Sequence, residues 1–458
     1  MQRISQIVCA LLWVCLAVGG TNRAWAQTSP PASTDPAPAA PDMNQRMQDL
    51  EKQVADLKAA LAAMKPPPPA AEAPAAAAPA TAAAVATPPA TAPAPITITS
   101  LLGPTTLSGF VDGYYGANFN HPASHTNQFR NFDIASNQFG LNMIELIVDK
   151  APDAAASRLG YHVALGFGQA MNTVNSLDGH DTSGAQQFAQ YLKEGYASYL
   201  FKVGKGLQVD AGKFVTPAGA EVIESKDNWN YSRGILFAYA IPYYHYGVRA
   251  KYTFNDKFNL TGFLMNGWNN IIDNNSGKTI GVSAAWTPNK KFGLIENYIG
   301  GPEGTNNNGD WRHLSDTVAT YNPTGKLSLM ANVDYGRGDR TINPNTFLNT
   351  TAWWSGVAGY LKYAVTPVVN AAVRYEYFDD HNGFATAVGP PFAPVGYEQH
   401  LQEFTGTLER TVASHLITRL EFRHDASNLP TFQKGQGFDK SQNTITGGII
   451  LTFDTTGK

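Results

Sequence analysis

Two runs of alternating charge in the C-terminal third of the chain could act on charged solutes. In order, these residues are Arg374 and Glu376, then Arg419, Glu421 and Arg423. Side chains two residues apart on a β-strand point to the same face. On neighbouring strands, the three arginines would therefore form a basic ladder with two carboxylates between them. Such a wall could orient a dipolar solute, or its charges could simply neutralise one another.

The same period of two places further ionisable side chains on this face. If the strands close into a barrel, this face lines its pore, and the phase predicts five more pore-lining residues, which are Asp112, Lys202, Asp210, Arg249 and Lys251. Four others share the inward phase, namely His162, Asp334, Lys362 and Glu409. In a water-filled lumen, inward charges of this kind would set ion selectivity.

The longest connection between predicted strands, residues 215–244, is rich in charge. Its charged residues are Glu221, Glu224, Lys226, Asp227 and Arg233. Long loops on a rigid scaffold often carry function. We therefore predict that this connection is a constriction loop folded into the pore. An external cap over the pore or a contact between subunits would use the same residues equally well.

The elements that position these charges are strands with one apolar and one polar face. Alternation is clear in residues 159–167, 327–335 and 369–377, and aromatic residues lie near the strand ends. Lipid outside and water inside explain both faces. A soluble sandwich also alternates, but it would need neither an export signal nor so many interfacial Tyr and Trp side chains.

About sixteen such segments lie in residues 105–453, an even number typical of outer-membrane barrels. Short turns fall near residues 152, 205, 256, 288, 323, 367 and 414, and the intervening connections run from about 12 to 30 residues. The sequence thus predicts an all-β, transmembrane antiparallel β-barrel with a short tail at residues 454–458. Glu145 falls in phase with Phe139, Leu141 and Met143, which predicts either a β-bulge in the second strand or a different register of that strand.

The first 26 residues have the features of a signal peptide. Arg3 precedes an apolar run from Ile7 to Gly19, and Ala24-Trp25-Ala26 is a small-x-small cleavage site. The run is too short for a spanning helix. Both cysteines lie inside it, which leaves the mature chain without a thiol.

The next segments predict a stalk. Residues 27–42 are expected to be disordered, and residues 43–64 carry apolar side chains at alternating spacings of four and three, a heptad seam. We predict a coiled coil, most simply a trimeric periplasmic stalk, although a single amphipathic helix on another surface would show the same seam. Residues 65–104 form a Pro/Ala-rich linker that cannot bury a core and so cannot serve as a plug.

Composition excludes several functional classes. Without Arg3 and Arg23 of the signal, 31 basic residues face 36 acidic ones, a formal charge of −5 that does not favour a nucleic-acid partner. No Gly-x-Ser-x-Gly or His-Glu-x-x-His motif occurs. We therefore predict no enzyme activity, no metal site and no cofactor.

Several motifs resemble those of the OmpL-like β-barrel porins, a family also called porin-2. They lie at residues 109–115, 130–133, 137–139, 211–221, 230–233 and 242–249, the last with the sequence Pro-Tyr-Tyr-His-Tyr-Gly-Val-Arg. The likeness covers residues 105–453. It implies an outer-membrane channel of a Gram-negative bacterium and leaves the substrate undefined.

The predicted function is passive diffusion of small hydrophilic solutes or ions through a homotrimeric outer-membrane porin. Its partners would be outer-membrane lipid and the solutes themselves. Contact of the coiled coil with peptidoglycan or a periplasmic partner is left open. The alternative is a structural or adhesive barrel, anchored through its periplasmic coiled coil, in which the pore is incidental.

Overall fold

The computed structural model describes residues 103–175, 189–342, 349–386 and 398–455. The predicted signal peptide, coiled coil and nearly all of the linker lie outside these ranges. The strands are β1 (Thr106–Asn118), β2 (Gln138–Lys150), β3 (Leu159–Phe167), β4 (Leu192–Phe201), β5 (Leu207–Val215), β6 (Tyr244–Asn255), β7 (Phe258–Met265), β8 (Thr279–Asn289), β9 (Phe292–Gly304), β10 (Asn307–Tyr321), β11 (Leu327–Ile342), β12 (Asn349–Thr366), β13 (Val369–Asp380), β14 (Gln399–Ala413), β15 (Leu416–Ser427), β16 (Phe432–Lys434), β17 (Gly437–Asp439) and β18 (Ser441–Asp454). No helix in the described ranges is both long and apolar enough to cross a bilayer.

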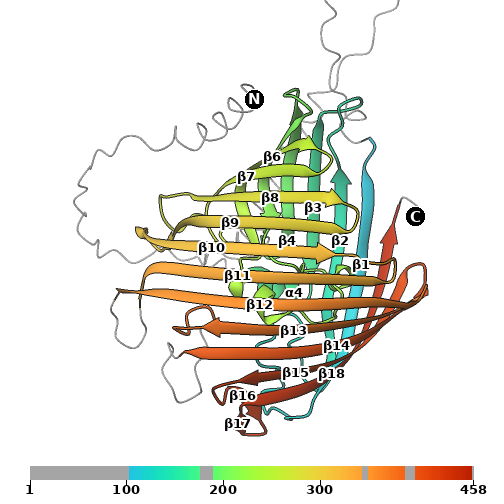
Figure 1. Ribbon diagram of the computed structural model, residues 1–458, viewed down its shortest axis with the longest axis vertical. Helices are drawn as coiled ribbons and strands as arrows, with labels where there is room; N and C mark the ends of the chain where they lie inside the picture. The colour runs from blue at the N-terminus through green and yellow to red at the C-terminus, as the bar shows by residue number, and fades with distance from the viewer. Residues whose placement is uncertain (1–102, 176–188, 343–348, 387–397, 456–458) are drawn as a thin grey trace, which may run out of the picture. The chain divides into compact units, whose positions relative to one another are not determined.

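Sixteen of these strands form a closed antiparallel barrel, which confirms the predicted fold class. Each strand pairs with its neighbour in sequence, and β1 closes the sheet against β18, while β16 and β17 form a separate hairpin (Figure 1). Closure leaves no sheet edge, so the backbone polar groups of the wall can pair within the barrel. The connections after even-numbered strands up to β14 are short, and we call that end the short-turn rim.

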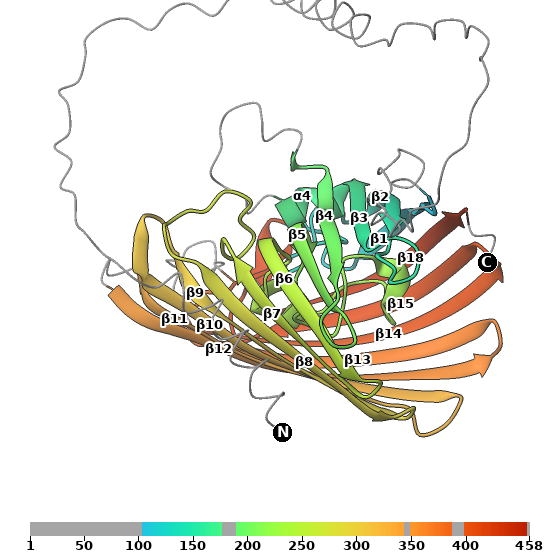
Figure 2. The same ribbon diagram turned by 90° about the horizontal axis from the view of Figure 1, so that it is seen from above.

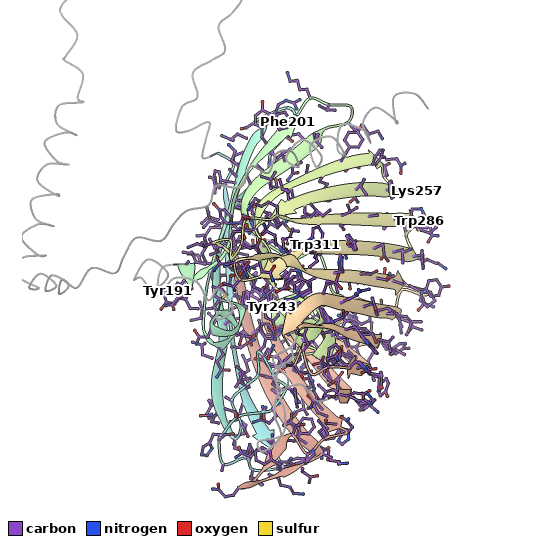
Figure 3. The ribbon with its side chains drawn as sticks, turned by 90° about the vertical axis from the view of Figure 1, so that its left-hand side faces the viewer. Tyr191, Phe201, Tyr243, Lys257, Trp286 and Trp311 are labelled. Carbon is purple, nitrogen blue, oxygen red and sulfur yellow. The ribbon has the colours of Figure 1, made fainter. Side chains whose placement is uncertain are left out.

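Alternation along each strand separates the two faces. On β15, for example, Leu420 and Phe422 are exposed, whereas Arg419, Glu421 and Arg423 are buried inside the barrel. Exposed aromatic residues lie near both rims. Figure 3 shows Trp286 at one end of the strands, beside Lys257 in a turn, and Tyr191 at the other end. Two aromatic bands around an apolar belt are the pattern of a lipid-facing barrel.

A polar cluster on β9 and β10 interrupts the apolar outer surface. Glu296 on β9 points outward, and its two oxygens accept hydrogen bonds from Ser315 at 2.9 Å and Thr317 at 2.5 Å on β10. A polar group facing lipid must find its partners within the protein. The two hydroxyl groups supply them for the Glu296 carboxylate.

The predicted bulge in the second strand is confirmed. The register of β1 and β2 shifts at Asn142, so that Asp112 pairs with Met143 while Gly113 pairs with Leu141. The extra residue returns Glu145 to the inner face, where it is fully buried. The Asn142 amide points inward and donates a hydrogen bond to Asp112.

The expected lengths of two connections were wrong. Residues 305–306 alone join β9 to β10, and residues 343–348 join β11 to β12, because these four strands extend farther than the alternation had indicated.

Lys202 was predicted on the pore wall, but it follows the end of β4 in an exposed turn. Its phase is inward, but the strand ends one residue earlier, at Phe201.

Candidate functional site

The longest connection within the described residues, 216–243, lies inside the barrel. This β5–β6 loop contains a 3₁₀ turn at Ser225–Asp227 and a short π-helix, η2 (Leu236–Ala240), that packs against β11 and β12. Tyr243, at its end, lies between the two rims (Figure 3). Hydrogen bonds join the loop to the inner faces of β1 and of every strand from β10 to β15.

The three arginines of the predicted ladder hold the backbone of this loop. Each donates to a carbonyl oxygen: Arg374 to Ser232 at 2.7 Å, Arg419 to Asn228 at 2.7 Å, and Arg423 to Arg233 at 2.6 Å. Two carboxylates between them accept from the loop's N–H groups. Glu421 binds the amides of Tyr231 at 2.5 Å and Ser232 at 3.0 Å, and Glu376 binds that of Ile235.

Asp112 anchors the loop from β1. Its carboxylate accepts hydrogen bonds from the Tyr231 hydroxyl at 2.8 Å and the Ser225 hydroxyl at 2.6 Å. Burial, reinforced by the Asp112 charge, raises the pKa of Tyr231, which keeps its hydroxyl protonated as a donor. Gly448 on β18 makes room for the ring, since a Cβ there would lie 2.6 Å from Tyr231.

The loop's own charges are paired as well. Glu221 bridges Arg374 at 2.6 Å and the amide of Gly234 at 2.5 Å. Glu224 pairs with Lys193, a buried β4 residue that also pairs with Glu145.

Two cations of the loop differ in setting. Lys226 pairs with Asp227 at 2.6 Å near the surface of the loop. Arg233 is buried, donates to the carbonyls of Tyr231 and Ile223, and lies 4.6 Å from the ring centroid of Phe132. Burial lowers the pKa of Arg233, and the negative charge of Asp112 opposes that shift.

The predicted pore-lining residues therefore divide into two groups. We use "covered wall" for the inward side chains of β1, β13, β14 and β15 beneath the loop. Six of the predicted residues belong to it and are buried, namely Asp112, Arg374, Glu376, Arg419, Glu421 and Arg423. They point inward as predicted, but the loop lies over them.

We use "open wall" for the inward residues of β5–β8. Arg249 pairs with Asp210 at 2.8 Å, and its guanidinium packs on the rings of Tyr196 and Phe214. Lys251 points the same way and is exposed. A cavity of about 350 Å³ lies here, and its lining includes the polar residues Gln208, Asp210, Thr216, Arg249, Lys251, Asn259, Thr261 and Ser283.

Sequence reasoning missed several participants. The neutral side chains of the open wall, among them Asn259, Thr261 and Ser283, carry no charge to single them out. The connection between β1 and β2 also folds inward: Asn131 donates to Ala238 at 3.0 Å and Tyr243 at 2.7 Å in the β5–β6 loop. Its charged residues at 130 and 133 occur in the family-like motif and were the available signal.

Other inward charges are paired locally. Lys362 lies 3.9 Å from Glu409, which also binds Arg419 at 2.6 Å. His162 contacts Asp149 at 2.8 Å and stacks on Tyr196. Helix α4 (Gln169–Asn175) lies beside β2 and β3 (Figure 2). Asp334 is buried and is 3.3 Å from the Asn332 amide.

Comparison with known proteins identifies the family. The sequence model of the family described as "Putative beta-barrel porin-2, OmpL-like" matches residues 104–453. The chain belongs to this family. It is thus an outer-membrane porin by family and by fold, and the resemblance found in the motifs is confirmed.

Solved porins share the fold of this porin-2 chain. The anion-selective porin from Comamonas acidovorans is 12% identical, with 76% of this chain and 99% of that chain covered and a TM-score of 0.50. OmpF from Salmonella typhi, in complex with daunomycin, is 12% identical, with 76% and 97% covered and a TM-score of 0.50. At this identity the likeness concerns the fold alone. A comparison with curated protein sequences gives no significant match.

Proposed function

We propose that this porin-2 chain forms a water-filled channel through which small hydrophilic solutes or ions diffuse passively. The observation that carries the proposal is the open wall, where the inward Lys251 and its polar neighbours line a cavity that the β5–β6 loop leaves unfilled. A barrel of this strand number is wide enough to hold an aqueous lumen. The loop occupies the opposite side and would narrow that lumen to the strip beside β5–β8.

In this proposal, Glu221, Glu224, Lys226 and Arg233 shape the constriction through the loop rather than by lining it as a filter. Three of them are engaged with the wall or the loop's own backbone: Glu221 with Arg374, Glu224 with Lys193, and Arg233 with two carbonyls. Arg249 and Lys251 would instead meet the passing solute. Because the open wall holds two cations against Asp210, we infer a preference for anions.

We infer a channel rather than an enzyme. The ionisable groups beneath the loop are engaged in holding its backbone, as the hydrogen bonds of Glu421 and Arg419 illustrate. Transport by diffusion needs no cofactor or energy source, and the family description supports a porin.

We further propose that the mature protein is a homotrimer whose N-terminal stalk lies in the periplasm. An even number of strands brings both ends of the barrel to the short-turn rim. Short turns on the periplasmic side are typical of such barrels. The heptad seam of residues 43–64 would then sit next to the membrane on that side and support a cyclic assembly.

The test is single-channel conductance of the refolded protein in a planar lipid bilayer, with the reversal potential measured across a salt gradient. We expect stepwise openings in groups of three and a reversal potential that indicates anion preference. An inserted, correctly folded barrel that carries no current would refute the channel. Removal of residues 43–64 should abolish the grouping of openings if the coiled coil supports the trimer.

A further inference from the structure

Four potential metal ligands meet on the outer face of the barrel, at the ends of β13 and β14 away from the short-turn rim. Asp379, His381 and Glu398 each offer a donor atom within 4.8 Å of the others, and His400 lies 3.1 Å from Glu398 and 3.5 Å from Asp379. This cluster is remote from the loop inside the barrel, and the proposed channel function does not use it. Two histidines together with two carboxylates form a donor set that suits Zn²⁺ better than Ca²⁺ or Mg²⁺, which prefer oxygen alone.

Strand register brings the four residues together. Asp379 on β13 lies directly opposite His400 on β14. His381 follows Asp379 by two residues, and Glu398 precedes His400 by two. Because a spacing of two keeps side chains on the same face, all four side chains lie on the outer face. The inward neighbours Phe378 and Asp380 are buried, which fixes the outward direction of Asp379.

Three distances between donor atoms are short enough for a small cation site. Nε2 of His400 lies 3.1 Å from Oε1 of Glu398 and 3.5 Å from Oδ1 of Asp379. Nδ1 of His381 lies 3.5 Å from the same oxygen of Glu398. Four ligands at tetrahedral Zn²⁺ bond lengths are roughly 3.3 Å apart, from simple geometry.

Two further features favour a ligand at this place. Among the described residues, Oδ1 of Asp379 is enclosed and receives no hydrogen bond, and its polar neighbour in the cluster is His400. Trp353 on β12 stacks on the His381 ring at 4.4 Å with an interplanar angle of 12°, which limits the orientations that the imidazole can adopt.

Although the sequence motifs predict no metal site, we propose that Asp379, His381, Glu398 and His400 bind one Zn²⁺ ion, or a similar divalent transition metal, at this rim of the barrel. The metal links the end of β13 to the start of β14. A simple set of ion pairs would require the histidines to be protonated. Metal binding instead requires them to be neutral.

The test uses the mature protein, produced without a polyhistidine tag, folded in detergent and stripped with a chelator. Calorimetric titration with Zn²⁺ should show one ion per chain, and Co²⁺ should give the visible absorption of a four-coordinate site. His381→Ala and His400→Ala should each weaken Zn²⁺ binding by more than about 100-fold, beyond the usual cost of losing a supporting residue.

The matched control is His424→Ala, which removes an outward histidine of β15 that hydrogen-bonds Asn443 instead of an acidic residue. This variant should bind Zn²⁺ as the wild type does. Heat-modifiable migration on a gel verifies that every variant has a folded barrel. Absence of Zn²⁺ binding, equal binding by the His381→Ala and His400→Ala variants, or Mg²⁺ binding as strong as Zn²⁺ binding would each overturn the proposal.

Discussion

The covered wall and the open wall of the barrel have the same sequence pattern but different surroundings. Both carry charged residues at alternate positions on antiparallel strands. On the covered wall, Arg374 and Glu376 are completely buried because the β5–β6 loop lies over them. On the open wall, Lys251 faces a cavity and is exposed.

The difference teaches that an inward charge in a barrel can serve the fold or the solute, and that the loop decides which. A buried charge is tolerated only when it is paired and hydrogen-bonded, and removal of one partner is then costly. Arg374 meets this condition through Glu403 at 2.6 Å, Glu221 at 2.6 Å and the Ser232 carbonyl. A charge in contact with water stabilises the fold little, but its field reaches passing ions.

The largest effect is expected for Arg374→Ala. The substitution leaves Glu221 buried without its cation and Glu403 with Arg423 alone, and it should lower the free energy of unfolding by about 3–5 kcal/mol. Because the same side chain holds the Ser232 carbonyl, the loop should loosen, and single-channel conductance should increase. Urea unfolding in detergent and bilayer recordings measure the two quantities.

The control for this variant is Arg337→Ala. Arg337 pairs with Asp339 at 2.7 Å, but its side chain is half exposed, so the change in stability should stay within about 1 kcal/mol. Conductance should match that of the wild type. Equal stability and equal conductance of the Arg374→Ala and Arg337→Ala variants would show that the covered wall does not hold the loop.

A smaller effect is expected for Tyr231→Phe. The change removes the hydroxyl that donates to Asp112 at 2.8 Å and should cost about 1.5–3 kcal/mol, as for hydrogen bonds to charged groups. The lower end is favoured because Ser225 and Asn142 still donate to Asp112. Tyr335→Phe, at an exposed tyrosine of β11, should change stability by less than about 0.5 kcal/mol in the same unfolding assay.

The strands were predictable from sequence because their signal is local. Each residue of the wall must suit either lipid or the interior, and a period of two records that choice along β3, β11 and β13. Even the bulge at Asn142 was detectable, since Glu145 would otherwise have pointed into lipid. The extra length of β9–β12 was not, because glycine and asparagine residues near 304–309 are typical of a loop.

The division between the two walls could not be predicted. It depends on contacts between residues far apart in sequence, such as Arg374 with Glu221 and Tyr231 with Asp112. The charges of the loop predicted that it enters the pore, but the alternating charges on the wall strands have the same sequence pattern whether or not a loop covers them. The path of the loop is a property of the closed barrel and not of any strand.

The smallest change in stability, and the sharpest test of the open wall, is expected for Lys251→Glu. The side chain is exposed, so the free energy of unfolding should change by less than about 0.5 kcal/mol. The reversal potential should nevertheless shift toward cation preference, and more so in dilute salt, because the screening length grows from about 3 Å at 1 M to about 30 Å at 0.01 M.

Lys257→Glu is the matched charge reversal for this experiment. Lys257 lies in the turn between β6 and β7, at the short-turn rim and outside the cavity (Figure 3). Both variants change the total charge equally, so a larger shift for Lys251→Glu isolates the effect of a charge within the lumen. Equal shifts would mean that ions do not pass along β5–β8, and the passage would then have to lie elsewhere in the barrel.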